Sequence, residues 1–270
     1  MRRILKNSAI TAVALALLYW LVWIYESSLR DPRFLDGWVL CAGIAVLFAF
    51  NVRKKLPMLP LGRATRWMQI HIYLGWFVIF AFGLHTGFSW PDGALNWALW
   101  VLFMLVSCSG IVGIYLTRSI PAKLEGCSER VLFQRIPKFR NNLAKEVEAL
   151  AITSVDQAGS LTIADLYANT LHDFFRRPQN VVSHLRSSRQ PLNRICGDLD
   201  KLARYLDAPG RNTLQAIKDL VVAKDDLDFQ YANQGILKLW LFVHVPATHG
   251  LIVLIVAHAA IMYAFSSGVP

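Results

Sequence analysis

Four of the five histidines inside apolar stretches of the sequence form two equally spaced pairs, and ionisable side chains in such stretches are costly and usually functional. His71 and His85 belong to the apolar run 68–88, and His244 and His258 belong to the run 236–265. The two members of each pair are 14 residues apart, and corresponding members of the two pairs are 173 positions apart. A neutral imidazole can bind a metal through one nitrogen while its other nitrogen donates a hydrogen bond. The repeated spacing indicates that the four side chains share one role.

An α-helix would place both histidines of a pair on the same face. Fourteen residues turn a helix through about 1400°, about 40° short of four full turns, and raise it by about 21 Å. If the two helices are parallel, His71 lies level with His244, and His85 lies level with His258. Two imidazoles that face each other suit the two axial positions of a haem iron, so two levels predict two non-covalent b-type haems. The alternatives are histidines that hydrogen-bond to neighbouring helices, or a relay for protons.

The helices that must position these side chains are expected to cross a membrane. Hydrophobic residues make up 55% of the chain, which is high for a soluble protein. Five apolar runs are long enough to cross about 30 Å of hydrocarbon, namely 8–25, 37–52, 68–88, 94–116 and 236–265. The first run follows basic residues as in a secretory signal, but it ends without a small-residue cleavage pattern, so we expect a retained anchor.

The basic residues of the short connections predict the orientation of these spans. Five Lys or Arg lie in 53–66, two lie in 26–37 and none lies in 89–93. Because cytoplasmic loops carry the excess of Lys and Arg, we expect the N-terminus in the cytoplasm and the C-terminus outside, in a multi-pass protein of a bacterial inner membrane. This placement of cations accounts for the net charge of +10. The sequence shows no pattern typical of nucleic-acid binding, so nucleic acid is not an expected partner.

A polar segment separates the fourth span from the fifth. Apolar residues recur there at helical spacing in 128–152, 161–175, 192–206 and 212–231, and Pro178, the SSRQP run and the APGR turn can stop helices between them. The predicted fold is therefore all-α, an integral membrane bundle of about five helices with an inserted helical soluble domain. Residues 1–117 hold spans one to four, 118–235 form the cytoplasmic domain, and 236–270 hold the fifth span, which completes the bundle. We expect the inserted domain to dock partners or to brace the bundle.

On its four histidines the sequence resembles the di-haem cytochrome b superfamily, whose haems lie between two parallel helices that each carry two histidines about this far apart. The resemblance covers spans three to five and implies a four-helix haem bundle. It does not identify a subfamily. The PEWY quinol motif of respiratory bc-complex cytochromes is absent, no flavin and nicotinamide domain follows the spans as in ferric reductases, and the insertion departs from the hydrogenase and formate dehydrogenase subunits.

Other residues near these histidines have expected roles in cofactor binding. Gly75 lies one turn from His71 on the same face, where a missing side chain leaves room for a flat macrocycle. Basic residues at the cytoplasmic helix ends are expected to pair with haem propionates, although the positive-inside pattern also explains them. These residues are Arg63, Arg66, Arg118 and Lys238.

A group of small residues, comprising Ser107, Cys108, Ser109, Gly110 and Gly113, would leave room for a macrocycle or allow close helix packing. His249 lies about 140° around the helix from His244, and we expect it to hydrogen-bond a neighbouring span or to line a quinone pocket. His172 and His184 have no partner at ligand spacing and are expected at the surface. The four cysteines form no CxxC or CxxCH motif, so neither covalent haem nor an iron–sulfur cluster is predicted in this chain.

The predicted function is transmembrane electron transfer by a membrane-anchor subunit of an oxidoreductase complex. The chain lacks nicotinamide, flavin and iron–sulfur motifs, so we expect a subunit and not a complete enzyme. Expected partners are membrane lipid, a quinone, and a multihaem c-type cytochrome, an iron–sulfur protein or a flavoprotein. The alternatives are a membrane sensor or scaffold with structural histidines, or a proton-relay transporter.

Overall fold

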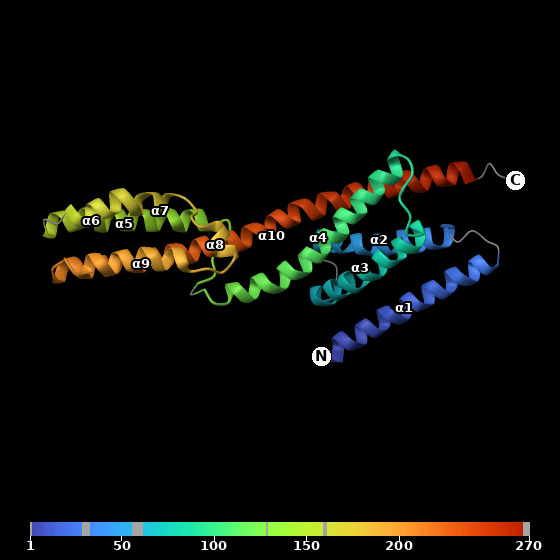
Figure 1. The fold of residues 1–270 in the computed structure, drawn as a ribbon, viewed down its shortest axis with the longest axis horizontal. Coiled ribbons are helices and arrows are strands. Elements are labelled where there is room, and N and C mark those ends of the chain that lie inside the picture. The colour runs from blue at the N-terminus through green and yellow to red at the C-terminus, as the bar shows by residue number, and fades with distance from the viewer. Residues whose placement is uncertain (1, 29–32, 56–61, 128, 159–160, 267–270) are drawn as a thin grey trace. The chain divides into compact units, whose positions relative to one another are not determined.

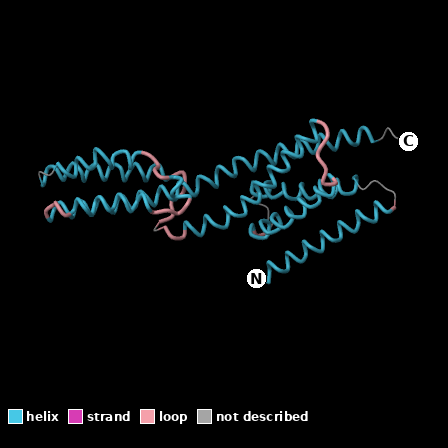
Figure 2. The backbone as a smooth tube through the Cα atoms, viewed as in Figure 1, coloured by secondary structure: helices cyan, strands magenta, loops and turns pink. Residues whose placement is uncertain are grey.

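The computed structural model describes residues 2–28, 33–55, 62–127, 129–158 and 161–266. Within these ranges the chain consists of helices joined by turns and short connections, and no described residue lies in a strand (Figures 1 and 2). The prediction of an all-α fold is confirmed for this part of the chain.

Five helices of the described chain are long and apolar enough to cross a membrane. They are α1 (Arg2–Ser27), α2 (Arg33–Lys55), α3 (Ala64–Thr86), α4 (Ala94–Leu124) and α10 (Ala208–Ser266). Each of the five apolar runs therefore lies in a helix, apart from the last residues of the third run. That run ends early because Gly87 adopts a left-handed conformation with φ of 58° and donates its N–H to the Leu84 carbonyl. The chain is compatible with a multi-pass membrane protein.

The chain forms two compact units, and both boundaries between them fall inside helices. The first unit contains Met1–Ile114 and Leu241–Pro270, and the second contains Tyr115–Trp240. In the first unit α3 contacts both α1 and α2, and the rings of Phe82 and Phe103 stack with their centroids 3.8 Å apart. Residues from α1, α2, α3, α4 and α10 share one apolar core: Leu18, Val22, Leu40, Ile44, Val78, Ala81, Phe82, Phe103 and Leu251.

The second unit packs short helices against the first half of α10. They are α5 (Ile136–Ala158), α6 (Leu161–Leu166), a π-helical turn (Tyr167–Leu171), α7 (His172–Arg176), α8 (Val181–Leu185) and α9 (Gln190–Ala203). Their core consists of Val147, Ile163, Leu171, Phe174, Phe175, Leu192, Leu199, Leu214, Ile217 and Val221. The short helix α8 is not anticipated by the sequence pattern.

The helix predicted from residue 128 begins eight residues later, at Ile136. In the segment before Ile136, two glutamines of α10 form hydrogen bonds with backbone groups that a helix would otherwise pair. Gln230 accepts a hydrogen bond from the Val131 N–H at 2.8 Å, and Gln234 donates to the Val131 carbonyl at 2.9 Å. Because these bonds replace helical ones, the segment stays irregular and ends in a turn before Ile136, although its apolar residues have helical spacing.

Helix α10 joins two elements that the sequence pattern separates. The predicted helix 212–231 and the predicted span 236–265 are one helix of 59 residues, about 88 Å long. The intervening sequence Ala-Asn-Gln-Gly contains no proline and only one glycine, so it carries no strong signal that ends a helix. This length is about three times the thickness of the hydrocarbon core. The apolar stretch 236–265 is the part of α10 suited to a membrane, and the part before it is polar.

Candidate functional site

The two predicted histidine pairs flank one packed layer of the first unit. Val78 lies midway between His71 and His85, and Leu251 lies midway between His244 and His258. Seven residues turn a helix by about 700°, so each midpoint residue shares the face of its histidines. Val78 and Leu251 are both 3% exposed and belong to the same core. This face of α3 and of α10 therefore turns toward the bundle interior, with a histidine two turns to either side of the packed layer.

Space is open beside Gly75, one turn from His71, whereas the layer around Val78 is tightly packed. All four imidazoles are half-buried, and a Cβ built at Gly75 would meet no atom within 4 Å. By contrast, a Cβ at Gly43 would lie 2.7 Å from the Val78 side chain. The space expected beside Gly75 is present, and its use by a macrocycle stays a prediction.

His85 is held by a buried carboxylate of α2. Its Nδ1 lies 2.8 Å from Oδ1 of Asp36, which is only 2% exposed. The neighbouring Gly37 permits this contact, because a Cβ there would lie 3.0 Å from Cε1 of His85. A carboxylate only accepts hydrogen bonds, so Nδ1 is the donor, and in the neutral imidazole the lone pair lies on Nε2.

His244 is held by a hydroxyl of α4. Its Nδ1 lies 2.7 Å from Oγ of Ser109, and the same Oγ lies 2.9 Å from the Val106 carbonyl. Because the hydroxyl has one hydrogen and donates it to that carbonyl, it accepts from Nδ1–H of His244. The lone pair of the neutral ring is again on Nε2. A Cβ at Gly110 would lie 3.8 Å from Cε1 of His244, an ordinary contact. Two of the predicted small residues, Ser109 and Gly110, therefore lie beside this ring.

The other two candidate ligands lie in aromatic or electrostatic contact with neighbours. The ring of His71 packs against Phe50 with centroids 5.3 Å apart, and His258 lies within electrostatic range of His85. No described group of three or more His, Cys, Asp or Glu side chains is arranged to hold a metal ion directly. A haem iron needs only two axial protein ligands, so this finding does not bear on the histidine pairs.

The predicted propionate partners lie at helix ends or on exposed surfaces. Arg63 precedes the first residue of α3, and its side chain and that of Arg66 are exposed. Arg118 is exposed on α4. The ammonium of Lys238 lies 3.9 Å from the centroid of the Phe133 ring, a cation–π contact. Pairing of Lys238 with a propionate would have to replace this contact, and the role of all four cations stays a prediction.

His249 bonds within its own helix. Its Nδ1 donates to the Val245 carbonyl at 2.7 Å, and its ring meets Phe48 of α2 edge-on, with centroids 5.1 Å apart. The ring of His249 therefore packs against a neighbouring helix. The expected hydrogen bond to a neighbouring span is wrong, because the acceptor is the Val245 carbonyl of the same helix.

A buried polar cluster of the second unit was missed by sequence reasoning. Lys224 and Asp228 are both 0% exposed and form an ion pair one turn apart on α10. Beside them, Nε2 of His184 lies 3.5 Å from Oδ1 of Asp225. The expected surface position of His184 is wrong, since it is 3% exposed, whereas the side chain of His172 is 42% exposed and lies at the surface as expected. The available signal was the spacing of Lys224, Asp225 and Asp228, which places them on the helix face of the apolar Ile217 and Val221.

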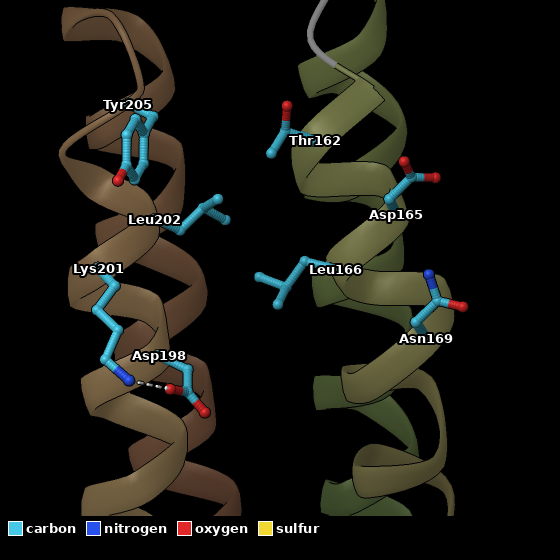
Figure 3. Close-up of a pocket in the computed structure, with 8 residues that line it drawn as sticks. All are labelled: Thr162, Asp165, Leu166, Asn169, Asp198, Lys201, Leu202 and Tyr205. Atoms are coloured by element: carbon cyan, nitrogen blue, oxygen red, sulfur yellow. Dashed lines mark hydrogen bonds and ion pairs between the residues drawn. The ribbon is translucent and has the colours of Figure 1, made fainter.

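A separate groove of about 390 Å³ lies in the second unit, where α9 faces α6 and the π-helical turn (Figure 3). Its lining residues are Thr162, Asp165, Leu166, Asn169, Asp198, Lys201, Leu202 and Tyr205. Lys201 pairs with Asp198 at 2.8 Å on the exposed side of α9. The groove contains no histidine or cysteine and is separate from the four-histidine site of the first unit.

Comparison of the chain with protein-family models, curated proteins and solved structures finds no match. The functional argument therefore depends on the four histidines and on the groups that orient them. Asp36 and Ser109 are the two orienting residues that the sequence alone does not assign.

Proposed function

We propose that the chain is a di-haem b-type cytochrome that transfers electrons across a bacterial inner membrane. The observation that carries this proposal is that His85 and His244 each donate Nδ1–H to a protein acceptor, at 2.8 Å and 2.7 Å. Histidines that bind metals almost always donate their other N–H to a carboxylate, a carbonyl or a similar acceptor, which fixes the ring and its tautomer. If a haem is bound, Nε2 of each of these rings would be the coordinating atom.

The chain's own residues would hold and orient two haem groups. His71 with His244, and His85 with His258, would serve as the axial pairs, and the open space at Gly75 would admit a flat ring. Bound haem b would supply exchange of one electron between ferric and ferrous iron. The hydrogen bonds of Asp36 to His85 and of Ser109 to His244 restrict the rotation of these two rings, so they would hold both imidazoles in position beside a bound haem. Arg63, Arg66, Arg118 and Lys238 would pair with the propionates.

We further propose that this protein is a membrane-anchor subunit. The excess of basic residues in 53–66 supports a cytoplasmic N-terminus and an external C-terminus. The helical segment 118–235 would then be a cytoplasmic domain that docks a partner. The electron donor or acceptor would be a quinone in the lipid, or a multihaem c-type cytochrome, an iron–sulfur protein or a flavoprotein.

A proton-relay transporter is the second candidate function. The buried pair of Asp36 and His85 favours it, because carboxylate and imidazole chains within membrane helices commonly carry protons. In that case, as in a sensor or scaffold, the protein would contain no iron, so an iron measurement separates the cytochrome from both alternatives.

The test is a haem count on purified protein. The reduced-minus-oxidised spectrum should show a sharp low-spin b-type band, with about two haems per wild-type chain by pyridine haemochrome. Replacing His71, His85, His244 or His258 singly with alanine should lower the count to near one, since each variant breaks one axial pair. His249→Ala is the matched control within the same helix and should keep both haems. A colourless protein without iron, or a count unchanged in all four variants, would refute the proposal.

A further inference from the structure

The two histidine levels differ in the charge of the group that orients the ligand. His85 donates to the carboxylate of Asp36, whereas His244 donates to the hydroxyl of Ser109. We infer that Asp36 is a positioning residue that makes His85 the stronger electron donor, so that the two haem sites have unequal reduction potentials. This inference depends on the proposed function and adds to it an order between the two sites.

The bond to Asp36 is the stronger of the two. A hydrogen bond to an ionised acceptor is roughly twice as strong as one between neutral groups. Asp36 is 2% exposed, so water screens its charge little. It also lies in the first turn of α2, where the helix dipole stabilises a negative charge. The imidazole of His85 is therefore polarised toward Nε2 by a nearby, weakly screened anion.

The hydrogen bond from His244 to Ser109 polarises its imidazole less. Its hydroxyl donates its own hydrogen to the Val106 carbonyl, so His244 meets a neutral oxygen. Among the described residues of the first unit, Asp36 is the only buried acidic side chain. The difference in charge between the levels is therefore local to the pair of His85 and His258.

A stronger donor favours the oxidised state of the iron to which it binds. Ferric iron carries one more positive charge than ferrous iron, so a basic ligand stabilises it more, and hydrogen bonding to the ligand is one of the levers by which a protein sets potential. The site at the level of His85 and His258 should therefore have the lower midpoint potential. At the same applied potential, its ratio of oxidised to reduced haem should exceed that of the other site by at least about tenfold. This corresponds to a difference of about 59 mV between the two midpoint potentials, since each is a one-electron couple.

The test is a redox titration of the full-length protein in lipid nanodiscs, followed by the haem absorption band. Wild type should titrate in two steps separated by at least this amount. Asp36→Asn keeps the shape of the side chain but removes its charge. It should raise the lower midpoint potential by about 59 mV, which is a tenfold change in the ratio of oxidised to reduced haem, and leave the other midpoint unchanged. The same substitution in the His71→Ala background, which retains the site of His85 and His258, assigns the shifted midpoint to that level. Ser109→Ala is the matched control and should move only the other site, by less than about threefold.

Asp36→Glu keeps the carboxylate and guards against loss of haem in Asp36→Asn. It should retain the lower midpoint, and the low-spin electron paramagnetic resonance signal assigned to that site should stay closer to wild type than in Asp36→Asn. Equal midpoints in wild type, or an equal shift of both sites in Asp36→Asn, would overturn the inference while the haem count of two still upholds the proposed cytochrome. A protein without haem would instead refute the proposed function itself.

Discussion

Replacing Asp228 with asparagine should destabilise the second unit, because it leaves the ammonium of Lys224 buried without its counter-charge. Both side chains are 0% exposed, and Oδ2 of Asp228 accepts from Nζ of Lys224 and from the Gln179 N–H. Lys224 would keep its bond to the Arg177 carbonyl at 3.0 Å and its contact with the Phe174 ring at 3.8 Å. These neutral contacts cannot replace an anion.

The expected cost is about 3 kcal/mol of unfolding free energy. Removing one partner of a buried ion pair costs about 3–5 kcal/mol. The lower end applies here, because the amide oxygen of asparagine can still accept from Gln179. In addition, burial lowers the pKa of Lys224, so the ammonium can release its proton when its partner is lost.

Hydrogen exchange on the full-length protein in nanodiscs measures this cost locally. If opening equilibrates faster than exchange, 3 kcal/mol corresponds to about a hundredfold faster exchange of the amides around Lys224 in α10. Lys224→Met with Asp228→Leu should restore much of the protection, since an apolar pair needs no counter-charge. The matched control is Asp200→Asn, which breaks the 2.6 Å pair with Lys218 at an exposed site and should cost less than about 1 kcal/mol. Exchange in Asp228→Asn as slow as in wild type would refute this reasoning.

Two further outcomes follow from single side chains. Burial raises the pKa of the Asp225 carboxyl above its ordinary 3.8, against the opposing charge of His184. The folded protein therefore holds this proton more tightly than the unfolded chain, and the resulting stability is complete below 3.8 and lost as pH rises through the raised pKa. Relative to Asp225→Asn, wild type should gain protection in corrected hydrogen exchange as pH falls from about 7 toward about 4, and an opposite trend would contradict the sign. Gly75→Leu should leave the fold intact, because a Cβ there meets nothing within 4 Å, yet lower the haem count from near two to near one, and an unchanged count would show that the space holds no macrocycle.

The five long apolar helices could be predicted from the sequence because their signal is local. A run of about twenty apolar residues is sufficient to indicate a candidate span, and all five runs lie in helices apart from the last two residues of the third run. The predicted helix boundaries were less accurate where a tertiary contact determines the end of the helix. The segment before Ile136 has apolar residues at helical spacing but bonds to Gln230 and Gln234. Those partners are about a hundred positions away, and no local pattern reveals them.

The buried ionic cluster of the second unit shows a different limit. Lys224 and Asp228 have the spacing of an ordinary exposed pair on a helix, and composition alone favours a solvated face. Only the packing of α7 and α8 against α10 places them inside. His184 was assigned to the surface for the same reason, because a histidine in a polar segment is buried only if a distant partner such as Asp225 meets it.

The candidate site divides along the same line. His71 with His85, and His244 with His258, could be found from the sequence, because each pair lies on one helix whose fixed turn relates position to direction. Asp36 lies on α2, beside His85 of α3, and Ser109 lies on α4, beside His244 of α10. Whether Asp36 and Ser109 lie level with these histidines depends on the axial offset between neighbouring helices. Residue spacing within one helix does not specify that offset. Spacing on a regular helix therefore predicts candidate ligands, whereas the side chains that hydrogen-bond to them become visible only when the packed bundle is known.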